Sequence, residues 1–265
     1  MMSDDKTGSG QSGQSGQAGR AGTAHASGDE PGFKNSKRQG GEWLPPRMRK
    51  DVDISIPYSD PPTDKLMEFY ATWAENYDAD LIDAYGYMAP TDAVAGMMTL
   101  GLAPDARILD AGCGTGQAGA LLAAAGFTHV DGADLSPEMR AVAARLGVYR
   151  NLHHLDMTAD YVPQLVDYAQ PDDGPYDALY DAVICVGVFG YGPPHVGDLP
   201  RIMDAARPGA PVLVTVNGKG WEKMGWEDSL MPVLDAAGVT LAARTRIRHM
   251  VKEGVHAELL ELRRG

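Results

Sequence analysis

The residues best suited to chemistry lie in one run, Arg107 to Gln117, in which an aspartate precedes three closely spaced glycines. Ile108 and Leu109 are typical of a buried strand, and Gln117 to Ala125 of a helix. Because glycine carries no side chain, a ligand can approach the backbone of such a turn, and the first N–H groups of the helix are free to bind polar ligand atoms. The pattern predicts a strand, turn and helix that bind a nucleotide-like ligand.

Two ligand classes use such a turn. Gly114, Gly116 and Gly119 match G-x-G-x-x-G, a loose signature of dinucleotide binding. Asp110, however, precedes the first glycine, where its carboxylate would repel a pyrophosphate but could accept hydrogen bonds from an ammonium group. The string DAGCGTG resembles motif I of the class I S-adenosylmethionine (SAM) dependent methyltransferases, whose cofactor has an amino acid end and no phosphate. An NAD-dependent oxidoreductase remains the alternative.

A second acid follows the next predicted strand. His129 to Ala133 is typical of a short strand, and Asp134 ends it, 18 residues after Gly116. A carboxylate about 20 residues after the glycine turn often binds the two hydroxyls of a ribose. Ser136 and Pro137 then predict a helix start. The alternative interpretation of Asp134 is an ordinary loop acid.

The resemblance to the methyltransferases implies further cofactor contacts. After a third strand at Val148 to Leu155, Asp156 would bind the adenine amino group and Met157 would pack on the ring. Upstream, W-A-x-x-Y-D resembles the lid of small-molecule methyltransferases, in which the tyrosine covers the methionine end of SAM; core packing is the alternative for this tyrosine. The full set of expected contacts is Tyr77, Asp110, Gly112, Gly114, Gly116, Gln117, Asp134, Leu135, Asp156, Met157 and Val186.

The loop VGVFGYGPPH follows a fourth strand, expected at Tyr180 to Val186, and should face the methyl group because open α/β sheets bind ligands at the carboxyl ends of their strands. His195 is the first candidate for a general base, with Tyr191 next. A structural role at a helix start is the alternative for His195. The loop lacks the D/N-P-P-Y/F/W string of base and amino methyltransferases, which counts against base methylation.

The amino-acid composition restricts the kinds of molecule that this protein can bind. The net charge is −13, and residues 1–63 carry eight acids and eight bases, so the acidic excess lies in residues 64–265. An acidic domain repels a phosphate backbone, which argues against nucleic acid. No apolar run has the length of a membrane span. We expect a soluble cytoplasmic protein without a disulfide or a metal site; His153 and His154 would face opposite ways on a strand.

The order of the predicted elements indicates an α/β fold. Residues 1–62 are expected to form a disordered tail, rich in Gly, Ser and Gln, with a basic linker. Residues 63–265 would form a Rossmann-like class I methyltransferase domain, with lid helices at 63–101, a seven-stranded mostly parallel sheet and helices on both faces. Helices are expected near Thr63 to Tyr77, Thr91 to Leu100, Ala159 to Tyr168, His195 onward and Trp226 to Ala237, and a final antiparallel pair at Val239 to Met250 and Val255 to Arg263.

Four strings resemble the methyltransferase-like subgroup from the Williams-Beuren syndrome region: W-A-x-x-Y-D, DAGCGTG, ADLSPEM and the stretch from GPPHV to RPG. The resemblance implies methyl transfer from SAM to a small molecule by in-line displacement. It implies no particular methyl acceptor and no oligomeric state. A SAM-binding sensor or partner subunit without activity stays open beside the enzyme.

Overall fold

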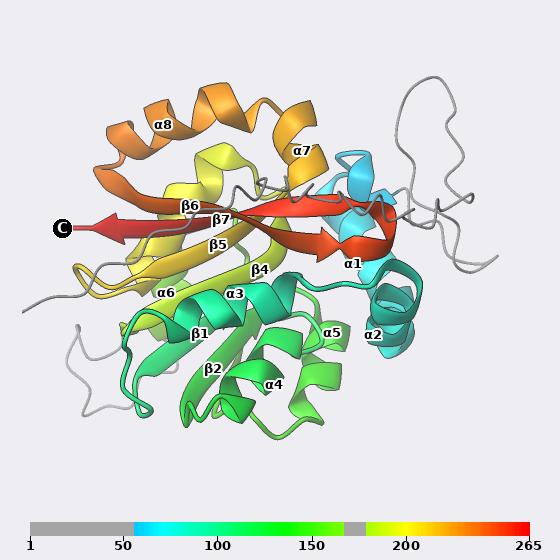
Figure 1. Cartoon of the computed structure of the whole chain (residues 1–265). Coiled ribbons are helices and arrows are strands. Elements are labelled where there is room, and N and C mark those ends of the chain that lie inside the picture. Colours follow the sequence, from blue (N-terminus) through cyan, green and yellow to red (C-terminus); the bar gives the residue numbers. More distant parts are fainter. Residues whose placement is uncertain (1–55, 167–178) are drawn as a thin grey trace, which may run out of the picture. The chain divides into compact units, whose positions relative to one another are not determined.

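Seven strands form one sheet in the computed structural model, which describes residues 56–166 and 179–265. Their order is β3-β2-β1-β4-β5-β7-β6; the pairs from β3 to β5 are parallel, and β7 is antiparallel to both β5 and β6 (Figure 1). The predicted seven-stranded, mostly parallel α/β sheet is confirmed. The strands are β1 (Arg107–Ala111), β2 (His129–Asp134), β3 (Leu152–His154), β4 (Ala182–Phe189), β5 (Val212–Asn217), β6 (Val239–Met250) and β7 (Val255–Arg264).

The central strands are buried on both faces. On β1, Ile108 belongs to the core on one face and Leu109 to the core on the other, and on β4 Ile184 and Cys185 alternate in the same way. Adjacent side chains of a strand point to opposite faces, so a strand covered on both sides needs apolar residues at successive positions. This requirement explains why the strands are continuous apolar runs in the sequence.

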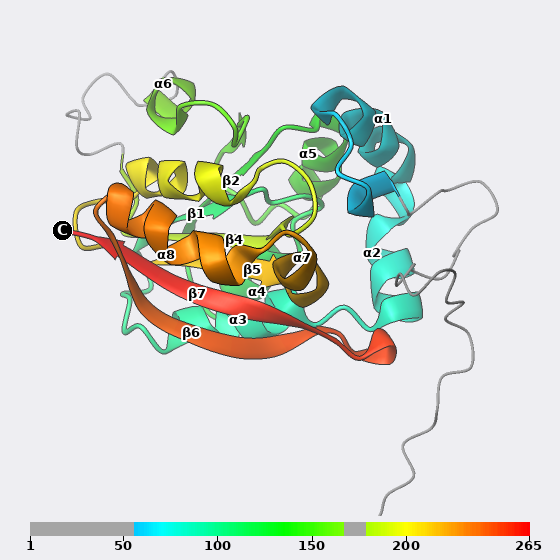
Figure 2. The same ribbon diagram turned by 90° about the horizontal axis from the view of Figure 1, so that it is seen from above.

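Helices supply the other half of each core (Figure 2). They are α3 (Ala89–Met98), α4 (Gln117–Ala124), α5 (Pro137–Ala144), α6 (Tyr161–Val166), the 3₁₀ helix η4 (Val196–Ala205), α7 (Gly218–Lys223) and α8 (Trp226–Ala236). Helices α3 and α4 pack on the Ile108 face, and α6, η4 and α8 on the Leu109 face. The Ser136 hydroxyl accepts the Met139 N–H at 3.2 Å, which confirms the predicted start of α5.

Four short helical segments within residues 63–85 lie at the carboxyl ends of the parallel strands (Figures 1 and 2). We call residues 63–85 the lid: α1 (Thr63–Trp73), η2 (Ala74–Asn76), α2 (Tyr77–Asp80) and η3 (Leu81–Tyr85). Phe69, Trp73 and Tyr85 are buried with Met250 and Val255 from the β6–β7 turn. Most of the predicted aromatic stripe therefore packs the lid against the sheet.

The fourth strand differs from the prediction of Tyr180 to Val186. Tyr180 forms only an isolated bridge to Ala206, and β4 continues to Phe189. The register shifts between Cys185 and Phe189, where Gly187 has a φ of +76° and its N–H donates to Thr215 Oγ1 at 2.8 Å. An interior glycine of this kind makes a β-bulge, which redirects the end of β4.

The ends of other helices and strands also differ from the prediction. β3 has only three residues rather than the predicted eight, and Thr63 is the first residue of α1, not its cap. Helix α7 was not predicted; it begins after Asn217, whose Oδ1 accepts the N–H groups of Lys219 and Gly220. A short polar residue at the end of a strand can cap a following helix. Asn217 is such a residue, so the start of α7 has a recognisable signal in the sequence.

Two predicted segments lie outside the described residues: the tail as far as residue 55, and the turn at 171–175. The predicted boundary at residue 63 falls inside packed structure, because Ile56–Tyr58 form a 3₁₀ helix and the Tyr58 ring meets that of Tyr191 edge to face, with 4.9 Å between centroids. Among the helices of the described ranges, none combines the length and apolar character that a bilayer crossing requires.

Candidate active site

The loop after β1 contains two glycines that no other residue could replace without displacing a neighbour. Gly112 has a φ of +71°, and a Cβ there would lie 2.3 Å from Val188 Cγ2. Gly116 has a φ of +97°, and its Cβ would lie 2.6 Å from Leu146 Cδ1. Residues with side chains rarely adopt such φ values. The glycines therefore let the loop lie directly against β4 and the chain that follows α5.

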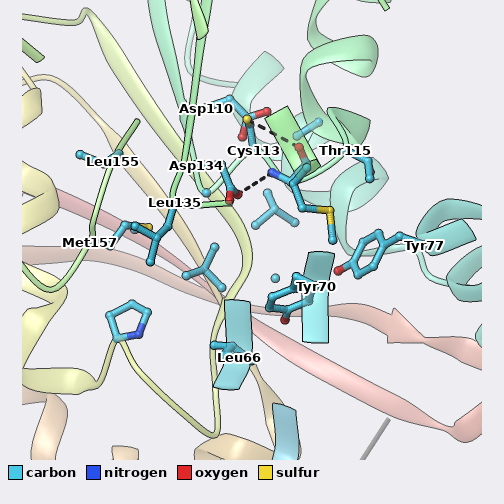
Figure 3. Close-up of a pocket in the computed structure, with 18 of the residues that line it drawn as sticks. Leu66, Tyr70, Tyr77, Asp110, Cys113, Thr115, Asp134, Leu135, Leu155 and Met157 are labelled. Carbon is cyan, nitrogen blue, oxygen red and sulfur yellow. Dashed lines mark hydrogen bonds between the residues drawn. The ribbon is translucent and has the colours of Figure 1, made fainter. Parts of the chain in front are cut away.

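This loop borders a cavity of about 140 Å³, which we call the loop cavity (Figure 3). Side chains from the lid and from the carboxyl ends of the first four strands surround it. Among the residues that line it are ten of the eleven predicted cofactor contacts: Tyr77, Asp110, Gly112, Gly114, Gln117, Asp134, Leu135, Asp156, Met157 and Val186. The eleventh, Gly116, does not line the cavity; a Cβ there would point at Leu146 and Tyr149.

Asp110 on β1 is 1% exposed, and its Oδ2 accepts a hydrogen bond from the Tyr149 hydroxyl at 2.6 Å. Burial raises the pKa of Asp110 to about 7, and the nearby charge of Asp134 contributes in the same direction. A buried carboxylate is stabilised in its charged form by an adjacent cation. This part of the cavity therefore favours a positively charged ligand group.

Asp134 at the end of β2 holds the loop in place. Its Oδ2 accepts the Gly114 N–H at 2.9 Å, and its Oδ1 accepts the Ser136 N–H at 2.8 Å. Burial raises its pKa. A carboxylate can accept about four hydrogen bonds, so Asp134 keeps capacity for hydroxyl groups of a ligand while it fixes the backbone around it.

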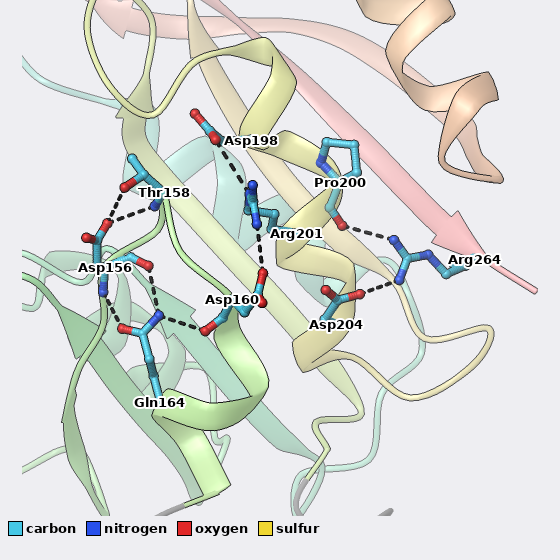
Figure 4. A network of polar contacts seen from close by, with 9 residues as sticks. All are labelled: Asp156, Thr158, Asp160, Gln164, Asp198, Pro200, Arg201, Asp204 and Arg264. Carbon is cyan, nitrogen blue, oxygen red and sulfur yellow. Dashed lines mark hydrogen bonds and ion pairs between the residues drawn. The ribbon is translucent and has the colours of Figure 1, made fainter.

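Asp156 follows β3 in a loop that several hydrogen bonds hold (Figure 4). Its Oδ1 accepts the N–H and the hydroxyl of Thr158 at 2.9 and 2.7 Å, and its own backbone N–H and carbonyl both bond to the Gln164 amide. Arg201 of η4 joins this region by an ion pair with Asp160 at 2.8 Å. The loop thus presents Asp156 and the buried thioether of Met157 to the cavity.

The side chain of Asp78 attaches the lid to the glycine loop. Asp78 of α2 accepts the Thr115 hydroxyl at 2.5 Å and the Gln117 amide at 2.7 Å, both at Oδ1. Gln117, predicted as a cofactor contact, therefore also joins the lid to the start of α4. Next to it, Tyr77 packs edge to face on Trp73, with 4.7 Å between centroids, so its ring both lines the cavity and packs the lid.

A second cavity of about 90 Å³ adjoins the first, and we call it the aromatic cavity. It shares seven lining residues with the loop cavity: Leu66, Tyr70, Tyr77, Tyr87, Gly187, Val188 and Pro193. Five further aromatic rings complete its walls: Tyr58, Trp73, Tyr85, Phe189 and Tyr191. The described residues that line it include no Asp, Glu, Lys or Arg.

The two predicted catalytic residues are in different surroundings. Tyr191 lines the aromatic cavity, against Tyr58. His195 lines neither of these two cavities; its side chain is 46% exposed, and its Nε2 lies 3.5 Å from Asp60 Oδ1. Its backbone N–H donates to Asp198 at the start of η4. These contacts favour the structural alternative, a residue at a helix start, over a general base.

Several residues of the site were not predicted. Gly187 was detectable, because a glycine inside an apolar strand indicates a bulge. Thr115 lies within the glycine motif, so it could have been predicted as a residue of the site. Tyr149, Asn217 and His249 come from three distant segments, and no local motif indicates that they belong to the site.

A family model described as a methyltransferase domain matches residues 73–256, more than half of the chain. The chain belongs to this family. Human methyltransferase-like protein 27 is 27% identical to this methyltransferase over 202 residues, which cover 76% of the chain and 75% of the human protein. The predicted resemblance to the Williams-Beuren subgroup is thereby confirmed.

Solved structures share the fold of this methyltransferase. Magnesium protoporphyrin IX methyltransferase from Synechocystis PCC 6803 with bound S-adenosylhomocysteine (SAH) aligns with a TM-score of 0.53 and 16% identity, over 77% of this chain and all of that one. The [4+2]-cyclase SpnF aligns with a TM-score of 0.54 and 15% identity, over 78% of this chain and 98% of that one. These alignments confirm the Rossmann-like class I methyltransferase fold.

The protein is a SAM-dependent methyltransferase, and magnesium protoporphyrin IX methyltransferase, which shares its fold, has also been solved with bound SAM. The loop cavity fits SAM, because it combines a buried carboxylate that favours a cation, a second carboxylate with free acceptor capacity, and apolar walls. When bound, SAM supplies an electrophilic methyl group on a positively charged sulfonium.

The raised pKa of Asp110 predicts that SAM binding releases a proton. Well below pH 7 this carboxyl is largely protonated in the free protein, and a cation beside it would lower its pKa. SAM affinity should therefore rise with pH up to about 7, and close to one proton should be released per SAM at pH 6. Calorimetry in buffers of different ionisation enthalpy measures this release. Asp110→Asn should abolish it; release that persists in the variant would assign it to another group.

The bonds of Asp78 predict that the lid retains SAM. Asp78→Ala removes the acceptor for Thr115 and Gln117, and we expect about tenfold faster SAM dissociation because two charge-assisted hydrogen bonds are lost. Stopped-flow fluorescence measures the rate. Asp83→Ala, an exposed carboxylate on the same lid, is the matched control and should leave the rate unchanged. Equal rates in the two variants would contradict a role of this contact.

Proposed function

We propose that this methyltransferase transfers the methyl group of SAM to a small molecule bound in the aromatic cavity. The observation that carries the proposal is the contact between the two cavities, which share seven lining residues. Holding a nucleophile against the methyl carbon, in line with the sulfur, contributes on the order of 7–11 kcal/mol to lowering the barrier without any catalytic side chain.

We assign the residues of the loop cavity as follows. Asp110 faces the ammonium group of SAM, and Asp134 accepts hydrogen bonds from the ribose hydroxyls. Asp156 accepts from the adenine amino group, while Met157 and Leu135 pack on the ring. Their positions at the ends of three adjacent parallel strands support this order, because SAM would then extend across the strand ends.

Three observations support a small molecule over a macromolecule. Part of the wall of the aromatic cavity comes from lid residues such as Trp73, and part from Tyr58, which precedes the lid. The end of β4 has the sequence FGYGPP and lacks the string by which many methyltransferases hold the planar nitrogen of a base. The net charge of −13 opposes approach of a phosphate backbone. Tyr191, which lines the cavity, would position the substrate.

A screen with methyl-labelled SAM tests this proposal. The purified protein is incubated with a metabolite extract, total RNA or a protein extract in separate reactions, and the label is followed by size fractionation and mass spectrometry. We expect label in a compound of low molecular mass. Label that enters only RNA or protein would overturn the small-molecule assignment while leaving SAM as the cofactor. The cytoplasmic location stays a prediction, to be checked by microscopy of the tagged protein.

A further inference from the structure

A polar pair lies in the otherwise aromatic and apolar wall of the aromatic cavity. Asn217 ends β5 and His249 lies near the end of β6; both line the cavity, and they are only 9% and 4% exposed. Asn217 Nδ2 lies 3.0 Å from His249 Nε2. Buried polar side chains normally have partners for each of their polar atoms, so the remaining atoms of the pair identify what a ligand must supply.

The backbone around Asn217 determines which way its amide faces. Asn217 Oδ1 accepts the N–H groups of Lys219 and Gly220 at 2.9 and 3.2 Å. The amide oxygen is therefore directed at the start of α7, and the NH₂ group is directed at His249. Because that group is a donor, His249 Nε2 must be the unprotonated, accepting nitrogen.

The proton of neutral His249 then lies on Nδ1. Burial lowers the pKa of His249 to about 4, so the ring is neutral at physiological pH. Nδ1 is buried and has no hydrogen-bond partner among the described residues. The ring is held edge-on to Tyr87, with 5.2 Å between centroids, and the His249 carbonyl accepts the Met88 N–H at 2.8 Å. A rigid donor thus lacks its partner.

The walls of the aromatic cavity indicate which other chemical groups its ligand carries. Aromatic rings favour a flat ring that packs on or against them, and the absence of charged side chains among the described lining residues makes an ionic group costly to bury. Aromatic cages also bind cations. A cation, however, has no lone pair for an N–H donor and would be repelled by it.

We propose that His249, oriented by Asn217, donates a hydrogen bond from Nδ1 to an uncharged aromatic substrate that carries an accepting oxygen or ring nitrogen. This inference rests on the proposed function, since it names the substrate class for the same cavity. It makes His249 a substrate-binding residue, and it excludes His249 as the base, because the one ring nitrogen without a partner among the described residues already carries a proton.

Three bicyclic aromatic probes test the substrate class: naphthalene, the isosteric quinoline, and the cation N-methylquinolinium. Each is titrated at pH 8 into the full-length protein saturated with SAH, and binding is followed by calorimetry or by ligand-observed NMR. We expect quinoline to bind about tenfold more tightly than naphthalene, the effect of one hydrogen bond, and N-methylquinolinium to bind most weakly. Equal binding of the three, no binding of any, or a preference for the cation would overturn the proposal.

His249→Phe retains a ring and removes the donor, and the preference for quinoline over naphthalene should disappear while SAH affinity stays unchanged. A preference that persists would overturn the role of His249. If this variant does not fold, long-range ¹H–¹⁵N NMR of the wild-type imidazole decides: we expect a proton on Nδ1 and none on Nε2, and the opposite tautomer would refute the assignment. Because these measurements need no methyl transfer, their failure is distinguishable from failure of the extract screen.

Discussion

Asp134→Ala should weaken SAM binding about 100-fold or more. The carboxylate accepts the N–H groups of Gly114 and Ser136, so the substitution removes the group we assign to the ribose and also leaves two backbone donors of the site without their acceptor. Each charge-assisted hydrogen bond contributes about 1.5–3 kcal/mol. The loss of two such bonds to the ribose hydroxyls therefore accounts for the expected loss of affinity. Calorimetric titration with SAM and with SAH measures it.

Two further variants test whether the loss of SAM affinity is specific to the carboxylate of Asp134. Asp134→Asn keeps the shape, but its NH₂ group would face the N–H of Gly114 or of Ser136, so it should restore only part of the affinity. Asp105→Ala removes an exposed carboxylate just before β1 and should have no effect. Unchanged SAM affinity in Asp134→Ala, with the thermal stability of the protein preserved, would show that the cofactor does not contact this residue.

Gly187→Ala should reduce methyl transfer by about 100-fold or more, because the two cavities meet at this residue. A Cβ at position 187 would lie 2.3 Å from the Tyr87 hydroxyl oxygen, and the φ of +76° is one that alanine rarely adopts. The Tyr87 ring would have to move, and it belongs to the walls of both cavities. Turnover is measured with the substrate that the labelled-SAM screen identifies.

The Tyr87 hydroxyl provides a matched test of this cause. Without that oxygen, the nearest atom to the new Cβ is the ring carbon at 3.5 Å, an ordinary contact. The double variant Gly187→Ala, Tyr87→Phe should therefore recover much of the lost activity relative to Tyr87→Phe alone, less the cost of the positive φ. Gly197→Ala, where a Cβ would meet nothing within 4 Å, is the control. No recovery in the double variant would mean that backbone strain, rather than the clash, disables the enzyme.

Most of the lining of the loop cavity could be predicted because its information is local. The glycine turn, the Asp110 that precedes it and the helix that follows are adjacent in the chain, and glycine is required there by φ values that other residues rarely adopt. Asp134 and Asp156 each stand where a parallel strand ends, and parallel strands bring their carboxyl ends to one edge of the sheet. Continuous apolar runs predicted the strands because both faces of the sheet are covered.

The aromatic cavity, which we propose as the substrate site, is decided by tertiary structure. The aromatic cavity joins Tyr58, Tyr87, Gly187, Asn217 and His249, residues from segments that are far apart in the chain and share no pattern of spacing. His195 was the natural candidate from the sequence alone, because it follows the loop at the end of β4. The fold instead directs its side chain toward Asp60 and brings His249 into the cavity from the antiparallel edge of the sheet. The composition of a segment determines which element it forms, whereas only the packing of distant elements determines which side chains are buried together and which nitrogen of a histidine carries the proton.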